Sequence, residues 1–156
     1  MIIFNLTPRA GVGPVLLGSL RAQAREALSA LGFPLEHSRG PLDFFCESSI
    51  QTECSPEGRI WFIGLSCHER YTVQYQGKNV FALAAPELFT LVAASEISDT
   101  HEYESYEYLF PDQIITLWDA DEQYDRLGNE SKPVWAQVGV GDQSYATAIA
   151  VSRGKV

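Results

Sequence analysis

Apolar residues recur with a helical period between Leu20 and Leu31, and this pattern predicts an amphipathic helix. Ser19 is of the residue type expected at the N-cap, where its hydroxyl can accept a backbone N–H. Gly32 can adopt the left-handed backbone that ends a helix, and Pro34 prevents continuation. The apolar stripe consists of Leu20, Ala24, Ala27, Leu28 and Leu31.

The middle of the chain alternates between apolar and polar positions, which is typical of strands. Asp43 to Cys54 alternates throughout, and we expect further strands at Arg59 to Cys67, Tyr71 to Gln76 and Val80 to Leu83. The connections are short turns. They favour an antiparallel meander, since parallel strands need a crossover of a dozen or more residues.

A second helix is predicted from Pro86 to Ser95, because Pro is favoured in the first turn of a helix. Two strands, Tyr103 to Phe110 and Gln113 to Trp118, follow it, and Val134 to Val140 is the last predicted strand. Residues 152–156 are expected to be a frayed tail.

The order helix, strands, helix, strands predicts an α+β fold. We expect an antiparallel sheet of about six to seven strands with two helices packed on one face. The repeated order leaves open whether the chain holds two helix-plus-sheet repeats. Its 156 residues fit a single domain, 1–156.

Acidic residues are concentrated in one segment. The chain has 20 acidic and 11 basic residues and a net charge of -9. Residues 96–130 hold eleven acids and one base, Arg126, for a net charge of -10, whereas the remainder is at +1. This balance argues against nucleic-acid binding, which depends on Lys and Arg. It favours a basic protein partner.

Aromatic residues alternate with these acids, and Tyr and Trp are enriched at protein interfaces. We therefore predict an acidic and aromatic surface that binds a basic protein. The alternative is a solvated hairpin whose aromatic side chains face the core. The candidate partner-binding residues are Glu104, Tyr106, Glu107, Tyr108, Asp112, Trp118, Asp119, Asp121, Glu122 and Asp125.

Motifs for chemistry are weak along the whole chain, and we expect no catalytic residue, metal site or cofactor. Residues 119–130 have carboxylates at calcium-loop positions, but Tyr124 stands where the loop requires glycine. Cys67 and His68 are adjacent, so on a strand their side chains point to opposite faces. Buried strand cysteines are the favoured reading of the thiols.

We expect no secretory signal at the N-terminal segment, because its apolar run is too short for one. The sequence contains no stretch of the roughly 18 apolar residues that cross a membrane. Three cysteines cannot form a complete disulfide framework. These observations predict a cytoplasmic protein with reduced thiols and no membrane partner.

The segment Gly11-Val-Gly-Pro-Val-Leu-Leu-Gly18 and the helix ending Leu31-Gly-Phe-Pro34 resemble the opening of small bacterial α+β proteins. This opening is similar to the repeat unit of β-lactamase inhibitor protein and of small outer-membrane assembly lipoproteins. It also resembles toxin immunity proteins. Ser19 and Leu20 stand where the usual pattern has Met and Thr or Ser. The resemblance implies protein binding and carries over no catalytic residue.

Together these features predict a non-enzymatic, cytoplasmic protein-binding module, namely an immunity protein that neutralises a cognate bacterial toxin. The partner would be a basic protein, such as a toxin domain. Two alternatives remain: a hydrolase or ligand-binding enzyme whose site is assembled only in three dimensions, and a structural subunit of a bacterial assembly. The sequence leaves the oligomeric state open.

Overall fold

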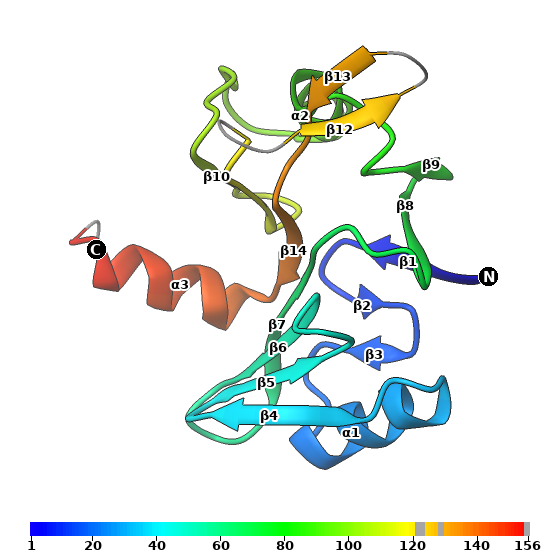
Figure 1. The fold of residues 1–156 in the computed structure, drawn as a ribbon. Coiled ribbons are helices and arrows are strands. Elements are labelled where there is room, and N and C mark those ends of the chain that lie inside the picture. The colour runs from blue at the N-terminus through cyan, green and yellow to red at the C-terminus, as the bar shows by residue number, and fades with distance from the viewer. Residues whose placement is uncertain (121–123, 128–129, 155–156) are drawn as a thin grey trace.

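The computed structural model describes residues 1–120, 124–127 and 130–154 (Figure 1). Its helices are α1 (Arg21–Ala30), α2 (Ala85–Ala93) and α3 (Gln143–Ser152). The strands are β1 (Ile2–Thr7), β2 (Gly11–Val12), β3 (Val15–Leu16), β4 (Leu35–Arg39), β5 (Leu42–Phe45), β6 (Ile50–Cys54), β7 (Ile60–Leu65), β8 (Tyr71–Tyr75), β9 (Lys78–Asn79), β10 (Glu107–Phe110), β11 (Ile115–Trp118), β12 (Tyr124–Leu127), β13 (Glu130–Pro133) and β14 (Gln137–Gly141).

The larger sheet has seven strands in the order β10-β11-β14-β7-β6-β5-β4, and every neighbouring pair in it is antiparallel. The predicted α+β class with a mainly antiparallel sheet is therefore confirmed, and the strands from β4 to β7 follow one another in an antiparallel meander. Side chains alternate between the two faces of this sheet. Ile63, Leu117 and Val138 are buried on the inner face, whereas Gln51 and Trp118 point to the outer face.

The smaller sheet has the order β3-β2-β1-β8-β9. In it β1 pairs with β8 in parallel, with Ile2 opposite Tyr71. The prediction that Tyr71 to Gln76 continues the meander is therefore wrong. After β7 the chain leaves the larger sheet, and Phe4 and Val73, which are register partners in the parallel pair, are both buried in the core. The predicted strand at Val80 to Leu83 is also wrong, since β9 ends at Asn79.

Helix α1 matches its prediction closely at its end. Gly32 has a φ of 94°, and the backbone N–H groups of Gly32 and Phe33 donate to Ser29 and Leu28, which forms a Schellman motif. The N-cap is Leu20 rather than Ser19. The Ser19 hydroxyl donates to the Leu16 carbonyl instead, and the Gln23 side chain accepts from the Leu20 N–H.

Two predicted elements differ from the structure in the middle and at the end of the chain. Residues 43–54 form the hairpin β5–β6 rather than one strand, because Cys46, Glu47 and Ser48 all adopt positive φ values. Residues 103–106 lie outside β10. The end of the chain holds α3, which the sequence did not predict. Its N-cap is Asp142, whose carboxylate accepts from the Tyr145 N–H at 2.9 Å.

A buried ion pair joins α1 to the larger sheet. Asp43 is only 1% exposed, and its carboxylate accepts hydrogen bonds from Arg21, Arg25 and Ser38. Burial alone would raise the pKa of Asp43, but these hydrogen bonds outweigh it and hold the pKa well below its usual range. The pair fixes the position of α1 against β5.

Candidate protein-binding surface

Four of the predicted acidic and aromatic residues, Glu104, Tyr106, Glu107 and Trp118, lie around the edge strand β10. Antiparallel pairing of β10 with β11 sets Glu107 opposite Trp118. Both side chains lie on the outer face of the larger sheet, where they are partly exposed. Tyr106, just before β10, is 55% exposed, and Glu104 is exposed as well. These four residues form an accessible group at the edge of the sheet.

Tyr108 points to the opposite face and packs into the core. Its ring lies 4.8 Å from that of Phe89 and 4.7 Å from that of Phe110. Its hydroxyl is 2.6 Å from Nδ1 of His101. Burial, with further contributions from carboxylates such as Glu96, raises the pKa of Tyr108. For this residue the structure matches the alternative interpretation of an aromatic side chain facing the core.

The Asp112 carboxylate forms hydrogen bonds within the chain. Its carboxylate accepts from the backbone N–H groups of Ile97 and Ser98 at 2.7 and 2.8 Å, which lowers its pKa. The contact is reciprocal, because the Glu96 carboxylate accepts from the backbone N–H groups of Asp112 and Gln113. Two carboxylates thus hold the loop after α2 against the turn between β10 and β11. This clasp positions the neighbouring acidic residues.

Asp119 lies next to this group at the end of β11, where it is half-buried with a φ of 51°. Its N–H donates to the Tyr106 carbonyl at 2.5 Å. Asp121 and Glu122 lie outside the described residues, as does the side chain of Asp125. The calcium-loop segment falls largely on the same part of the chain.

Two hollows flank β10, and they share the ion pair between Arg153 and Glu107. The pair joins the end of α3 to β10 at 2.8 Å, and its side chains are 45% and 39% exposed. The larger hollow, of about 810 Å³, is lined by acidic residues including Asp99, Glu104 and Glu107. The smaller, of about 170 Å³, lies between α3 and the outer face of the sheet. A partly exposed ion pair such as Arg153–Glu107 contributes about 0–1 kcal/mol to stability.

Two glycines lie beneath side chains that line the smaller hollow. Gly64 and Gly139 are cross-strand partners on β7 and β14. A Cβ atom at Gly139 would lie 2.5 Å from the Phe62 ring, and one at Gly64 would lie 2.6 Å from the Gln137 side chain. The absence of side chains at these two positions lets Phe62 and Gln137 lie flat across the sheet.

A β-bulge adds a second aromatic residue to this region. Glu53 pairs with Phe62 and Cys54 with Ile60, so Trp61 is the extra residue of β7. Its indole N–H donates to Glu53 at 2.6 Å. The ring of Tyr145 on α3 stacks on the Phe62 ring, with the two centroids 4.7 Å apart. The Trp61 ring meets the Tyr145 ring edge-on. These ring contacts anchor the first turn of α3 to the sheet.

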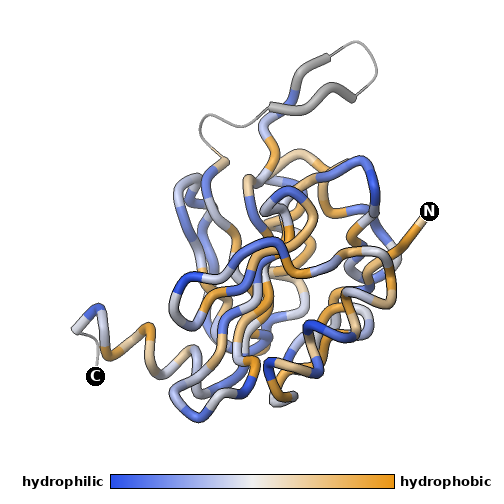
Figure 2. Tube along the Cα trace, turned by 60° about the horizontal axis from the view of Figure 1, so that its bottom comes forward, coloured by the Kyte–Doolittle hydropathy of each residue, from blue (hydrophilic) through white to orange (hydrophobic). Residues whose placement is uncertain are grey.

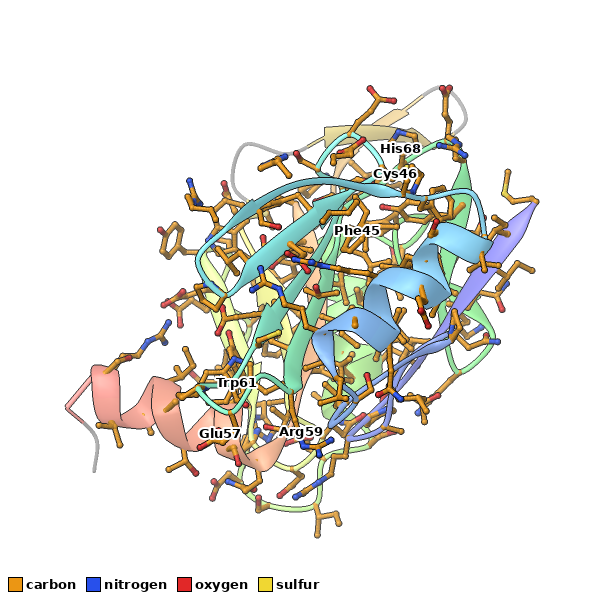
Figure 3. All side chains as sticks on the ribbon, turned by 90° about the horizontal axis from the view of Figure 1, so that it is seen from below. Phe45, Cys46, Glu57, Arg59, Trp61 and His68 are labelled. Carbon is orange, nitrogen blue, oxygen red and sulfur yellow. The ribbon has the colours of Figure 1, made fainter. Side chains whose placement is uncertain are left out.

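The structure brings together a second cluster, Cys46, Glu47 and His68, which the sequence pattern did not predict. The Cys46 Sγ lies 3.5 Å from Nδ1 of His68, and Nε2 lies 3.2 Å from the Glu47 carboxylate (Figure 3). The Arg70 N–H also donates to Nδ1, at 3.1 Å, which places the ring proton on Nε2.

The backbone of this cluster is held in an uncommon conformation. Three successive residues other than glycine have positive φ, each at a cost of about 1–2 kcal/mol. The carboxylate of Glu36 accepts from the N–H groups of Glu47 and Ser48, and these bonds lower its pKa. Cys46 is 3% exposed. The cluster has the groups of a thiol site, but the sulfur is buried.

Comparison of the chain with protein-family models, with curated proteins and with solved structures finds no match. In the described part of the chain, no group of three or more His, Cys, Asp or Glu side chains is arranged to hold a metal ion. The described helices include none that is long and apolar enough to cross a membrane. The interpretation of the surface therefore depends on its own geometry.

Proposed function

We propose that this chain is a non-enzymatic protein-binding module whose acidic and aromatic surface around β10 binds a basic protein. The observation that carries the proposal is the larger hollow, where Asp99, Glu104 and Glu107 lie together at the edge of the sheet. Tyr106 and Trp118 are exposed beside Glu107. The surface around β10 thus combines a hollow lined by carboxylates with accessible aromatic rings next to it.

Each part of this surface has a physical role in the proposal. Carboxylates grouped in a hollow concentrate negative potential, which speeds encounter with a basic protein and aligns it. Tyr106 and Trp118 offer large side chains that gain binding energy when a partner buries them. The clasp between Glu96 and Asp112 keeps the loop that carries Asp99 in place. A prearranged surface loses less conformational entropy on binding.

Within this class, we propose an immunity protein that neutralises a bacterial toxin in the cytoplasm. The resemblance of residues 11–34 to the opening of such proteins supports this assignment. So does the order of the larger sheet: β6, β5 and β4 lie outward from β7, and β11 and β10 lie outward from its partner β14. This order fits two helix-plus-sheet repeats. The parallel pair β1–β8 departs from a simple two-fold relation.

The test uses the proteins encoded by the genes on either side of this one as probes. Each is produced as an inactive variant, and its association with this chain is followed by stopped flow. We expect binding by a basic probe, with an association rate that falls at least about tenfold between about 20 mM and about 500 mM salt. Glu104→Gln and Glu107→Gln should slow association, whereas Glu26→Gln on α1 should not.

A salt-independent association rate would contradict the steering role, and binding unaffected by Glu104→Gln, Glu107→Gln and Trp118→Ala would place the interface elsewhere. Binding by neither probe in any salt concentration would count against the immunity assignment. Together these outcomes separate the general proposal of a basic partner from the particular proposal of a toxin.

A second candidate is a cysteine-dependent hydrolase, and the Cys46–His68–Glu47 cluster favours it. In such an enzyme the Cys46 thiol gives its proton to Nδ1 of His68, and its sulfur adds to the carbonyl carbon of an ester or amide. The tetrahedral adduct then expels the alcohol or amine, which takes the proton from His68, and water hydrolyses the resulting thioester to restore the thiol. Glu47 would orient the imidazole through Nε2. Burial of the sulfur, and the Arg70 N–H already bonded to Nδ1, place this candidate second.

Alkylation by iodoacetamide, located by mass spectrometry, tests the second candidate. An activated Cys46 should react faster than exposed Cys67, and His68→Gln should remove that advantage. If Cys46 reacts only after the chain is unfolded, the cluster is a structural one.

A further inference from the structure

We propose that the smaller hollow, between α3 and the outer face of the larger sheet, receives one arginine side chain of the partner. In the structure, Arg153 of the chain itself is paired with the Glu107 carboxylate, to which the partner guanidinium would bind. The inference rests on the proposed function and deepens it, because it names the partner residue that anchors the complex.

The size of the hollow fits a side chain. Its volume of about 170 Å³ is below the roughly 300 Å³ at which pockets for drug-sized ligands begin. Phe62 and Gln137, whose side chains cover Gly139 and Gly64, line the hollow on the side of the sheet. A single extended side chain from another protein fits a hollow of this volume.

The lining groups match a guanidinium. Two carboxylates, Glu53 and Glu107, and the side-chain amides of Gln51 and Gln137 line the hollow, and all four offer acceptor oxygens. The exposed ring of Trp118 lines it as well. A planar guanidinium can donate several hydrogen bonds in a fork and stack on an aromatic face, whereas an ammonium is a compact point charge. The chemistry therefore favours arginine over lysine.

Arg153 shows that Glu107 accepts a guanidinium. Its Nη2 lies 2.8 Å from the Glu107 carboxylate. Residues Tyr145, Ile149 and Arg153 line the hollow from successive turns of one face of α3. The internal ion pair is about half exposed, so solvent weakens it and a partner guanidinium can replace it with little loss.

The attachment of α3 permits such an exchange. Figure 2 shows the helix projecting from the body of the molecule, and none of its described residues is buried. Its first turn is fixed by Asp142 and by the stacking of Tyr145 on Phe62. Its last turn is joined to the sheet by Arg153. The C-terminal end of α3 can therefore move away from β10 while the first turn stays in place.

The test is a heteronuclear NMR titration of the chain with the peptide acetyl-Gly-Arg-Gly-amide. The same peptide with citrulline, which keeps the shape and removes the charge, is the control for the guanidinium, and a lysine peptide tests the fork geometry. Shifts should centre on Gln51, Glu107 and Trp118 for arginine alone. Arg153→Ala removes the internal competitor and should tighten binding by up to about fivefold. Glu107→Gln should abolish it, and Glu26→Gln should leave it unchanged.

Three results would overturn the inference: no shifts at about 10 mM peptide in Arg153→Ala, equal binding of the citrulline peptide, or shifts centred away from the hollow. Its failure is separable from that of the proposed function. If a basic protein binds and Glu107→Gln and Arg153→Ala do not change its affinity, the arginine site is wrong and the binding module stands. If the peptide binds as expected and neither flanking gene product does, the site stands and the proposed function fails.

Discussion

The ion pair that holds α1 on the larger sheet leads to a quantitative prediction. Asp43 accepts five hydrogen bonds at 2.6–3.0 Å: two each from Arg21 and Arg25 and one from Ser38. Replacing it by asparagine keeps the shape, but sets an amide donor against two guanidinium groups. Breaking a buried pair costs about 3–5 kcal/mol. The arginines are 29% and 38% exposed, so water relieves part of this cost.

We therefore expect Asp43→Asn to lower the free energy of unfolding by about 3 kcal/mol, at the low end of that range. For a chain of this size the midpoint of thermal unfolding should fall by about 6–12 °C. Urea unfolding followed by circular dichroism measures the change, with an unaltered m-value. The matched control is Asp99→Asn, which removes an exposed carboxylate at a positive φ that asparagine tolerates.

The pH dependence gives an independent check. The pKa of Asp43 in the folded chain lies below its unfolded value of about 3.9, so its contribution is complete above that pH and is lost as the pH falls further. Asp43→Asn should therefore flatten the acid side of the stability curve. A loss of less than about 1 kcal/mol, or an unchanged acid slope, would refute the reasoning.

Two further predictions concern the outer face of the sheet. Gly139→Ala sets a Cβ atom 2.5 Å from the Phe62 ring and should cost about 1–3 kcal/mol in urea unfolding; adding Phe62→Leu should recover part of the loss. Burial raises the pKa of Tyr145 to about 12, above its unfolded value of about 10. Stability should therefore decline as the pH rises from about 10 towards 12, and Tyr145→Phe should lessen that decline. No recovery of stability on adding Phe62→Leu, or an undiminished alkaline decline in Tyr145→Phe, would contradict the packing of these rings.

The sequence predicts the elements whose signals are local. Helix α1 ends as expected because Gly32 and the apolar stripe act within a few residues. Helix α3 is missed because apolar residues surround its axis and none becomes buried, so no amphipathic stripe exists to detect. The turn at Cys46 is missed because no glycine marks it; Glu36, eleven residues before Glu47, supplies the carboxylate that stabilises it.

In the candidate surface, too, local signals can be predicted from the sequence, whereas contacts between distant residues cannot. Alternation of acids and aromatics in this segment predicts an acidic and aromatic surface, and Glu107 and Trp118 lie opposite one another on the outer face of the sheet. It does not separate Tyr108, which packs on Phe89, from its exposed neighbours. Nor does it reveal that Asp112 serves the loop or that Arg153 reaches Glu107, since both depend on contacts between residues distant in the sequence.

The parallel pairing of β1 with β8 has a consequence for synthesis of the chain. Ile2 reaches its partner Tyr71 only after nearly half of the 156 residues have been made. Until then β1 can pair only with β2 on its other side, and Phe4 and Leu6, which are buried in the finished protein, lack the rest of the core. Contacts of such long sequence separation form slowly and leave apolar segments open to aggregation. A nascent chain that stalls before Tyr71 should therefore depend on chaperones that hold its first strand.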